Sequence, residues 1–503
     1  MNQAAVHPTD PPTAPTHRAA TVVVGAGLGG LLAAITAADG QPRSRVVVLD
    51  PHPPGGRARV DERDGFLFNR GPRALYRRGP ADRALRDVGV DTSRGGPPNL
   101  GGALAVVGGE EHRFPGQAID SARTTLFTPR QKVELSRTVA AMWRADERTT
   151  DGQSLRDWLD ARALDDRVRQ FVEALVRVAT YANAPEVFAA GPALANARAG
   201  IRPGVRYLDG GWQSLVDQLV AVATGRGVEI VRAGVRAVVP RAGVVEVVAE
   251  GATWEAASVV LAAGGPDAAA SLLPERPASW GRLAPAVTAA CLELGIRGVP
   301  DHRFALGIDE PLYGSTHAPP ADLAPPGHSV VHLMRYQPAD DDLDPAQQRA
   351  ALDALAVRMG ITSEMVVRER FLARMVVTGS LPAAATGGLA GRPAVAVAEH
   401  AGVLLAGDWV GARGAAARRR RLERRGGGEA GSGSIEHDGR RMITDRPTRG
   451  EADFEQERPR LEGLAYRITA RGRQPRTSCR TPGCGGSAPT ARASSAPQRG
   501  SPP

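Results

Sequence analysis

Short apolar runs and one glycine-rich turn organise the first fifty residues of the chain. Residues 22–24 are three valines, and residues 46–49 form a second β-branched run that ends on Asp50. Between them, the glycine-rich residues 25–30 precede the apolar helical pattern of residues 31–38. A strand, a glycine turn, a helix and a second strand that ends on an acid, in this order, predict a dinucleotide-binding βαβ unit.

Each glycine of the turn has a predicted task. Gly25 allows the turn, Gly27 lets the backbone approach a pyrophosphate, and Gly30 lets the helix pack closely on the strand. The turn, which includes Leu28, leads into a helix expected to start at Leu31, whose N-terminus presents unpaired N–H groups and a positive dipole end to the phosphates. We expect Asp50 to accept hydrogen bonds from ribose hydroxyls. The alternative, a glycine-rich loop in an ordinary α/β protein, does not explain the order of the elements.

Later segments separate into helical and extended patterns. Helices are expected at residues 129–146, 155–180 and around 344–359, and alternating strands at residues 289–296, 304–308 and 329–336. Further short strands are expected at residues 228–230, 258–261 and 403–405. The alternating strands favour antiparallel pairing, in contrast to the parallel pairing of the βαβ unit. The chain therefore reads as an α/β region with an inserted α+β region.

The charge of the chain is unevenly spread. The formal net charge is +9, but residues 412–503 hold 20 arginines and 10 acidic residues. The rest of the chain has 43 basic and 44 acidic residues, so it is close to neutral. The basic charge therefore belongs to the tail, and we expect no nucleic-acid partner. A length of 503 residues with 42% hydrophobic residues is sufficient for two or more domains with large cores.

The three cysteines, Cys291, Cys479 and Cys484, are too few for a disulfide framework or a Cys/His metal site, so we expect no metal. A lone histidine on a strand is usually structural, so His317, His328 and His332 receive no catalytic role. The chain contains no run of 18 consecutive apolar residues, so no transmembrane helix is predicted. Residues 1–19 lack a signal-peptide pattern and are expected to be a disordered leader, which makes a cytoplasmic location the default.

Three further motifs give the chain a family resemblance. Residues 55–59 read GGRAR, residues 71–76 read GPRALY, and residues 403–411 read VLLAGDWVG. Together with the N-terminal unit, they resemble the FAD-dependent superfamily of phytoene desaturases, protoporphyrinogen oxidases and amine oxidases. The resemblance covers about residues 20–411.

The resemblance implies several FAD-binding positions. The loop of Gly55, Gly56, Arg57 and Ala58 would wrap the pyrophosphate and ribitol, although a lone Arg57 would be read as a solvated surface residue. The loop of Gly71, Pro72, Arg73, Ala74 and Leu75 would pass the isoalloxazine ring. Gly407 and Asp408 would reach the ribitol or pyrophosphate end. Val235 would contact the adenine through its backbone, and an ordinary core valine is an equal alternative at that position.

The resemblance also implies a fold and a division into domains. The fold class is α/β, with a Rossmann-like FAD-binding domain on a parallel sheet and an interleaved α+β substrate-binding domain. The FAD-binding domain would comprise residues 20–79, 206–274 and 376–411, and the substrate-binding domain residues 80–205 and 275–375. Residues 412–503 would form a disordered tail.

The implied activity is an FAD-dependent desaturase, dehydrogenase or oxidase that transfers hydride from an apolar or amine-bearing small molecule to flavin N5. No catalytic residue is singled out. One alternative is a non-catalytic protein of the same fold that escorts apolar ligands, and another is an inactive product of a damaged gene. The resemblance also leaves open whether the protein makes peripheral contact with a membrane.

The segment after Gly411 departs from the family, whose next helix resembles LADAALSSG. Codons permitted for residues 417–425, read one base later, can encode LADAALSG, so we interpret the departure as a frameshift. Residues 442–469 resemble the start of an extracytoplasmic-function sigma factor. Residues 475–484, PRTSCRTPGC, fit an out-of-frame reading of its next helix. On this hypothesis, residues 412–503 form no evolved domain.

Overall fold

The computed structural model describes residues 15–40, 43–116, 118–338 and 344–411. The predicted tail, the frameshift and the sigma-like segment lie outside these residues, and so does most of the predicted leader. Among the described residues, no helix combines the length and the apolar character needed to cross a bilayer.

A seven-stranded sheet contains the predicted βαβ unit. Its strand order is β10-β11-β12-β1-β2-β9, and β18 also pairs with β12. Its strands are β1 (Thr16–Val24), β2 (Val46–Asp50), β9 (Glu229–Arg232), β10 (Val235–Arg241), β11 (Val244–Ala249), β12 (Ala252–Leu261) and β18 (Val403–Leu405). Pairing is parallel among β18, β12, β1, β2 and β9, and antiparallel between β10, β11 and β12. The mixed α/β class with a parallel Rossmann-like sheet is thus confirmed.

Strand β1 is longer than its apolar pattern predicts. It begins at Thr16, which pairs with Thr253 of β12, so residues 16–19 are strand and not the disordered leader that we expected. In this part of β1, exposed Thr16 and Arg18 alternate with half-buried His17 and Ala19, whereas residues 22–24 are buried. A strand needs apolar side chains only where its faces are covered, so the exposed extension carried no hydrophobic signal.

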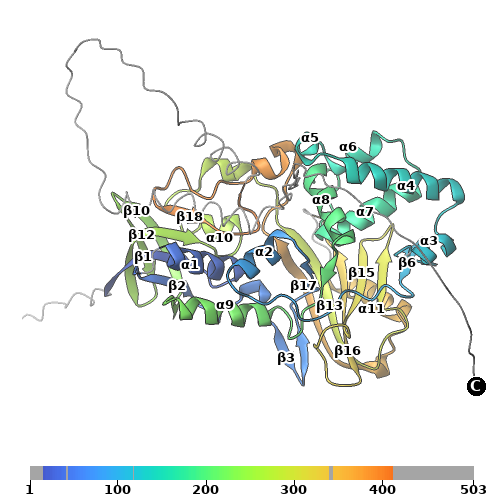
Figure 1. Ribbon diagram of the computed structural model, residues 1–503, viewed down its shortest axis with the longest axis horizontal. Coiled ribbons are helices and arrows are strands. Elements are labelled where there is room, and N and C mark those ends of the chain that lie inside the picture. The colour runs from blue at the N-terminus through green and yellow to red at the C-terminus, as the bar shows by residue number, and fades with distance from the viewer. Residues whose placement is uncertain (1–14, 41–42, 117, 339–343, 412–503) are drawn as a thin grey trace, which may run out of the picture. The chain divides into compact units, whose positions relative to one another are not determined.

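Two long helices cover one face of this sheet. Helix α1 (Leu28–Gly40) contacts β1, β2 and helix α9 (Gln213–Gly225), as Figure 1 shows. Nine consecutive residues of α1 are buried, from Gly30 to Ala38. Such a helix is apolar on all sides because it lies between the sheet and other elements. The short helix α10 (Pro266–Ala270) follows the carboxyl end of β12.

A second seven-stranded sheet has the order β17-β13-β16-β15-β14-β6-β7. Its pairs are antiparallel except for β14 with β6. Its strands are β6 (Leu104–Val107), β7 (Glu110–Arg113), β13 (Val287–Arg297), β14 (Phe304–Gly307), β15 (Leu312–Ala318), β16 (His328–Tyr336) and β17 (Val366–Thr378). The strands expected at residues 289–296, 304–308 and 329–336 are present. Strands β15 and β17 lacked a clear alternating pattern, and β15 is buried along its whole length.

Helices cover this second sheet. Helix α11 (Pro345–Arg358) packs on β13, β15, β16 and β17. The helices α4 (Pro129–Arg144), α6 (Leu155–Asp160), α7 (Asp166–Thr180) and α8 (Ala190–Ile201) lie together in Figure 1. The single helix expected at residues 155–180 is therefore two. The Asp165 side chain accepts a hydrogen bond from Arg167 N at 2.9 Å, and this N-cap starts a new helix.

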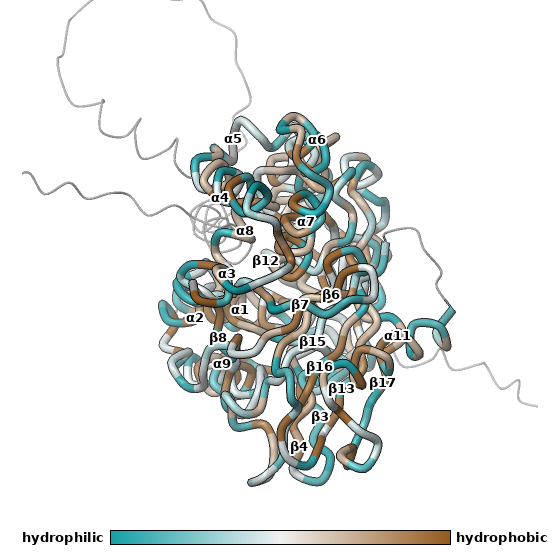
Figure 2. Tube along the Cα trace, turned by 90° about the vertical axis from the view of Figure 1, so that its right-hand side faces the viewer, coloured by the Kyte–Doolittle hydropathy of each residue, from teal (hydrophilic) through white to brown (hydrophobic). Residues whose placement is uncertain are grey.

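The remaining elements are short. They are the hairpin β3 (Asp61–Arg63) and β4 (Phe66–Phe68), the pair β5 (Leu75–Tyr76) and β8 (Val205–Arg206), and the helices α2 (Pro80–Asp87), α3 (Ala118–Arg123) and α5 (Glu147–Thr150). Single 3₁₀ turns occur at Gly56–Ala58, Ala278–Arg282, Ser363–Met365, Ala384–Thr386 and Gly388–Gly391. Figure 2 shows how apolar stretches are distributed along the chain. The division into an FAD-binding and a substrate-binding domain stays a prediction.

A pair of substitutions in α11 tests how this helix holds the second sheet. Leu352 is 0% exposed in the core between α11 and the sheet, whereas Val357 is 72% exposed. We expect Leu352→Ala to lower the free energy of unfolding by about 2–5 kcal/mol, because the cavity adds to the lost transfer energy. Val357→Ala, the control, should change it by no more than about 0.5 kcal/mol. Urea unfolding of both variants measures the difference, and equal effects would contradict the assigned packing.

Candidate nucleotide-binding site

The glycine turn after β1 has the geometry that its sequence predicts. Gly25 has φ +106°, and a Cβ on this residue would lie 3.0 Å from backbone atoms of Ala262. A Cβ on Gly30 would lie 1.9 Å from Gly25 O, so the helix approaches the turn as closely as the backbone allows. A Cβ on Gly27 would have no atom within 4 Å. The middle glycine therefore borders open space beside the first turn of α1, which begins at Leu28.

Asp50 closes this turn from the end of β2. Its Oδ2 accepts a hydrogen bond from Ala26 N at 2.7 Å, and its Oδ1 accepts one from His52 N at 2.8 Å. Each carboxylate oxygen has a further lone pair, so the side chain can still accept a ribose hydroxyl. The structure thus gives Asp50 a task in the turn that sequence reasoning did not foresee, and its contact with ribose stays a prediction.

The second glycine loop lies directly against the first. Gly55 N donates to Ala26 O at 2.8 Å, and Gly55 forms a parallel bridge with Gly27. Gly55 and Gly56 both have positive φ, at +119° and +53°. A Cβ on Gly56 would lie 3.6 Å from the Cα of Gly27. Ala58, at the end of the 3₁₀ turn, is buried, whereas Arg57 points outward.

Arg57 links this loop to β17 and to the segment that follows β18. Its Nη2 donates to Asp408 Oδ2 at 2.9 Å, and its Nη1 donates to Val377 O at 3.0 Å. Asp408 Oδ1 also accepts a hydrogen bond from Gly379 N at 3.2 Å. Both side chains are partly exposed, and such an ion pair contributes only about 0–1 kcal/mol to stability. The pair matters for the positions of its residues, because Arg57 and Asp408 come together beside Gly27, as we predicted.

Residues 71–75 form the third loop of the site. Arg73 Nη2 donates to Arg57 O at 3.0 Å, and its guanidinium lies 5.7 Å from the Trp212 ring. Burial, followed by the nearby charge of Arg57, lowers the pKa of Arg73. Arg73 Nε is buried and has no hydrogen-bond partner. The positive charges of Arg57 and Arg73 in one place favour an anion beside them.

The other predicted positions of the three loops have structural contacts. Gly71 N donates to Glu293 Oε1 at 2.6 Å, and Pro72 O accepts from the Tyr181 hydroxyl at 3.3 Å. Ala74 packs beside the core cluster that contains Phe66 and Phe68. Leu75 is buried in β5, opposite Arg206 of β8. A Cβ on Gly407 would lie 2.8 Å from Trp409 Nε1, so only glycine fits there.

Val235 is the first residue of β10 and is half-buried against the core of the first sheet. Ala233, two residues earlier, donates its N–H to Asp50 O at 3.1 Å. Val235 therefore lies on the segment that passes the end of β2. Both interpretations of this residue, backbone contact with adenine and ordinary core packing, stay open.

Five tyrosines gather next to the third loop, although the chain has only six. They are Tyr76, Tyr181, Tyr207, Tyr313 and Tyr336. The Tyr181 and Tyr336 rings lie 6.2 Å apart, and the Tyr313 and Tyr336 rings 6.5 Å apart. The hydroxyls of Tyr207 and Tyr313 lie 3.4 Å apart, and the fully buried Tyr336 hydroxyl has no partner. We did not predict this cluster, because its members come from distant segments of the chain.

Buried charges also surround the third loop. Glu293 on β13 is 0% exposed and forms an ion pair with Arg370 of β17, which also pairs with Asp61. Burial acts to raise the pKa of Glu293, but contacts with His332, Arg370 and the Gly71 N–H hold this pKa below its usual value. The sequence analysis assigned no role to Glu293, Arg370 or Asp61.

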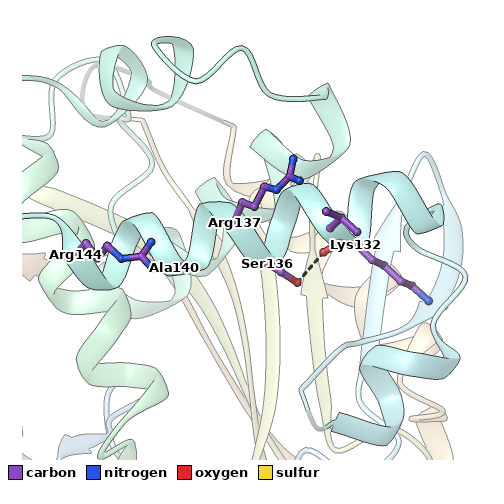
Figure 3. A pocket seen from close by; sticks show the side chains of 6 residues that line it. Lys132, Ser136, Arg137, Ala140 and Arg144 are labelled. Atoms are coloured by element: carbon purple, nitrogen blue, oxygen red, sulfur yellow. Dashed lines mark hydrogen bonds between the residues drawn. The ribbon is translucent and has the colours of Figure 1, made fainter.

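A surface hollow of about 500 Å³ lies elsewhere, along α4. Figure 3 shows Lys132, Ser136, Arg137, Ala140 and Arg144 along this helix, with the Ser136 hydroxyl donating to Lys132 O. The described residues that line the hollow all come from α4. We assign it no ligand, because no polar group of another element converges on it.

Comparisons with known proteins agree with the geometry. Residues 23–88 match the family model of an NAD(P)-binding Rossmann-like domain. A candidate protoporphyrinogen oxidase from Exiguobacterium sp. 255-15 superposes with a TM-score of 0.62 and 20% identity, over 79% of this chain and 95% of that one. Wild-type putrescine oxidase bound to putrescine has a TM-score of 0.60 and 17% identity, over 78% and 94% of the two chains.

Cyclohexylamine oxidase from Brevibacterium oxydans IH-35A has a TM-score of 0.56 and 15% identity, over 78% of this chain and 93% of that one. No curated protein sequence matches the chain. At these identities the similarity establishes a shared fold. The chain therefore has a Rossmann-like domain within the fold of these oxidases.

The tyrosine cluster predicts a dependence of stability on alkaline pH. Burial raises the pKa of Tyr207 to about 12, whereas an unfolded tyrosine has a pKa of about 10. The neutral phenol is thus favoured in the folded state, so its stabilising effect is complete below pH 10 and is lost as the pH rises towards 12. Between pH 10 and pH 12, the free energy of unfolding of Tyr207→Phe should fall by about 2–3 kcal/mol less than that of the wild type.

Urea unfolding at a series of alkaline pH values measures this effect. Ser315→Ala is the control, because it removes the 2.6 Å hydrogen bond of the Tyr207 hydroxyl and keeps the phenol. The control should retain this pH dependence or steepen it, because the lost hydrogen bond acts to lower the pKa of Tyr207. An identical pH dependence for Tyr207→Phe and the wild type would contradict the assignment.

Proposed function

We propose that this protein is an FAD-dependent oxidoreductase of the phytoene desaturase, protoporphyrinogen oxidase and amine oxidase superfamily, acting on an apolar or amine-bearing small molecule. The observation that carries the proposal is the convergence of the two glycine loops, Arg57 and Asp408 on one place. The similar folds of a candidate protoporphyrinogen oxidase and of two amine oxidases support it.

The residues present fit an FAD molecule. Open space at Gly27 and the exposed Gly56 leave the backbone accessible to a pyrophosphate, and Arg57 and Arg73 supply positive charge. Asp50 would hold the ribose, and Asp408 would hold the ribitol end. Gly71, Pro72, Arg73, Ala74 and Leu75 would border the flavin ring. When bound, the flavin would supply the hydride acceptor.

The chain's own residues would then orient the substrate and exclude water. The tyrosine cluster offers apolar ring faces and one unpaired hydroxyl beside the loop that contains Pro72. Buried tyrosines with raised pKa values stay neutral near pH 7, so they can donate hydrogen bonds without carrying charge. An amine-bearing or apolar molecule suits such a lining.

The spectrum of the purified full-length chain tests the proposal. We expect oxidised flavin absorbance at about one FAD per chain, with FAD identified after release by denaturation. Anaerobic mixing with putrescine, cyclohexylamine or a polyene should bleach this absorbance for a true substrate. A folded protein that is colourless and binds apolar ligands would favour the escort alternative. A chain that binds NAD(P) instead, or that never folds, would overturn the proposal.

A substitution at the open glycine tests where the nucleotide lies. We expect Gly27→Val to reduce FAD affinity more than tenfold, a loss of at least about 1.4 kcal/mol, because its side chain occupies the space beside the first turn of α1. The flavin-free fold should be little affected, since a Cβ at this position has no protein atom within 4 Å. Gly225→Val is the control, because Gly225 in α9 is equally unobstructed. Equal FAD content in both variants would contradict the placement.

A further inference from the structure

Three possible metal ligands share one face of the second sheet. Cys291 and Glu293 are two residues apart on β13, and Glu293 pairs directly with His332 on β16. One ligand atom from each, the thiol sulfur, a carboxylate oxygen and a ring nitrogen, lie within 4.8 Å of one another. All three residues are 0% exposed. We expected no metal site, because three cysteines, two of them in the tail, are too few for a Cys/His site.

Most imidazole nitrogens at this cluster lack hydrogen-bond partners. His332 Nδ1 makes an ion-pair contact with Glu293 Oε1 at 3.3 Å, whereas its Nε2 is buried and has no partner. His317 is also 0% exposed, and both of its nitrogens are unpaired. The two rings lie 4.3 Å apart, and His317 stacks on Tyr207 at 3.7 Å. Buried imidazole nitrogens almost always have a partner. The nitrogens without one therefore indicate a place for a hydrogen-bonding group or for an electron-pair acceptor such as a metal ion.

The surrounding charges can accommodate a cation. Arg370 faces Glu293 Oε2, but it also pairs with Asp61, which in turn pairs with Arg70. Glu293 Oε1 accepts the Gly71 N–H and keeps a lone pair for a metal ion. The thiolate and the carboxylate would together offset a divalent charge. Hydrogen bonds from Arg370 and Gly71 fix the orientation of the carboxylate, as outer-shell groups do at metal sites.

We propose that Cys291, Glu293 and His332 bind a divalent transition-metal ion of the zinc class. Thiolate and imidazole ligands favour Zn²⁺ and similar ions over Mg²⁺ and Ca²⁺, which prefer oxygen ligands. Three protein ligands leave a fourth position beside the His317 ring. None of the three ligands belongs to the two glycine loops, although Glu293 accepts the Gly71 N–H of the third loop.

Metal analysis and a Co²⁺ titration of the full-length protein test the proposal. We expect the protein as purified, or after addition of Zn²⁺ and removal of excess ion, to hold about one ion per chain. Co²⁺ should give a thiolate-to-metal charge-transfer band in a difference spectrum against the metal-free protein, and Zn²⁺ should displace it. Cys291→Ser should abolish this band, and His332→Gln should weaken Zn²⁺ affinity by more than about tenfold.

Two controls keep the result specific. His328→Gln changes a histidine on the same strand that bonds to Pro326 O, and the double variant Cys479→Ser/Cys484→Ser removes the other two thiols. Both should bind Co²⁺ with the wild-type band. A folded wild-type protein that takes up neither ion would overturn the proposal and favour ordered water at the imidazoles. An unchanged band in Cys291→Ser would also overturn it. The wild-type result does not depend on the folding of any variant.

Discussion

The backbone contact between the two glycine loops is the constraint on which the candidate site depends. Gly55 N reaches Ala26 O at 2.8 Å, and the Asp50 carboxylate holds the N–H of the same Ala26. The approach requires glycine, since Gly25 and Gly55 both have positive φ and a Cβ on Gly30 would collide with Gly25 O. With the loops held together, Arg57 is placed to meet Asp408, which is 351 residues later in the chain.

A second interaction connects this site to the other sheet. Glu293, on β13 beside the edge strand β17 of the second sheet, accepts the N–H of Gly71 from the third loop. Arg370 and Asp61 extend the contact to the β3–β4 hairpin. A buried carboxylate is costly unless it is paired and hydrogen-bonded, and here all its partners come from different segments. The same carboxylate belongs to the inferred metal site, so a metal ion there would also stiffen the loop that we propose borders the flavin.

The tyrosine cluster and the unpaired imidazoles lie on the same side of the second sheet. Tyr207 connects them, because its hydroxyl bonds to Ser315 while its ring stacks on His317. In a chain with only 4% aromatic residues, this concentration of rings contrasts with the glycine-lined nucleotide site. The glycine-lined site would therefore let phosphates approach the backbone closely, whereas large side chains fill the adjacent tyrosine cluster.

The sequence by itself determined the βαβ unit, because a glycine turn after a strand and an acid at the end of the next strand can be recognised locally. The second and third loops were singled out by the family resemblance. The sequence did not determine that α6 and α7 are separate, that β1 begins at Thr16, or that β15 is a strand. Only the tertiary structure decided that Cys291, Glu293 and His332 meet and that five tyrosines share one place. Those contacts follow from strand order and register in an antiparallel sheet, which bring together residues whose sequence neighbours carry no sign of the pairing.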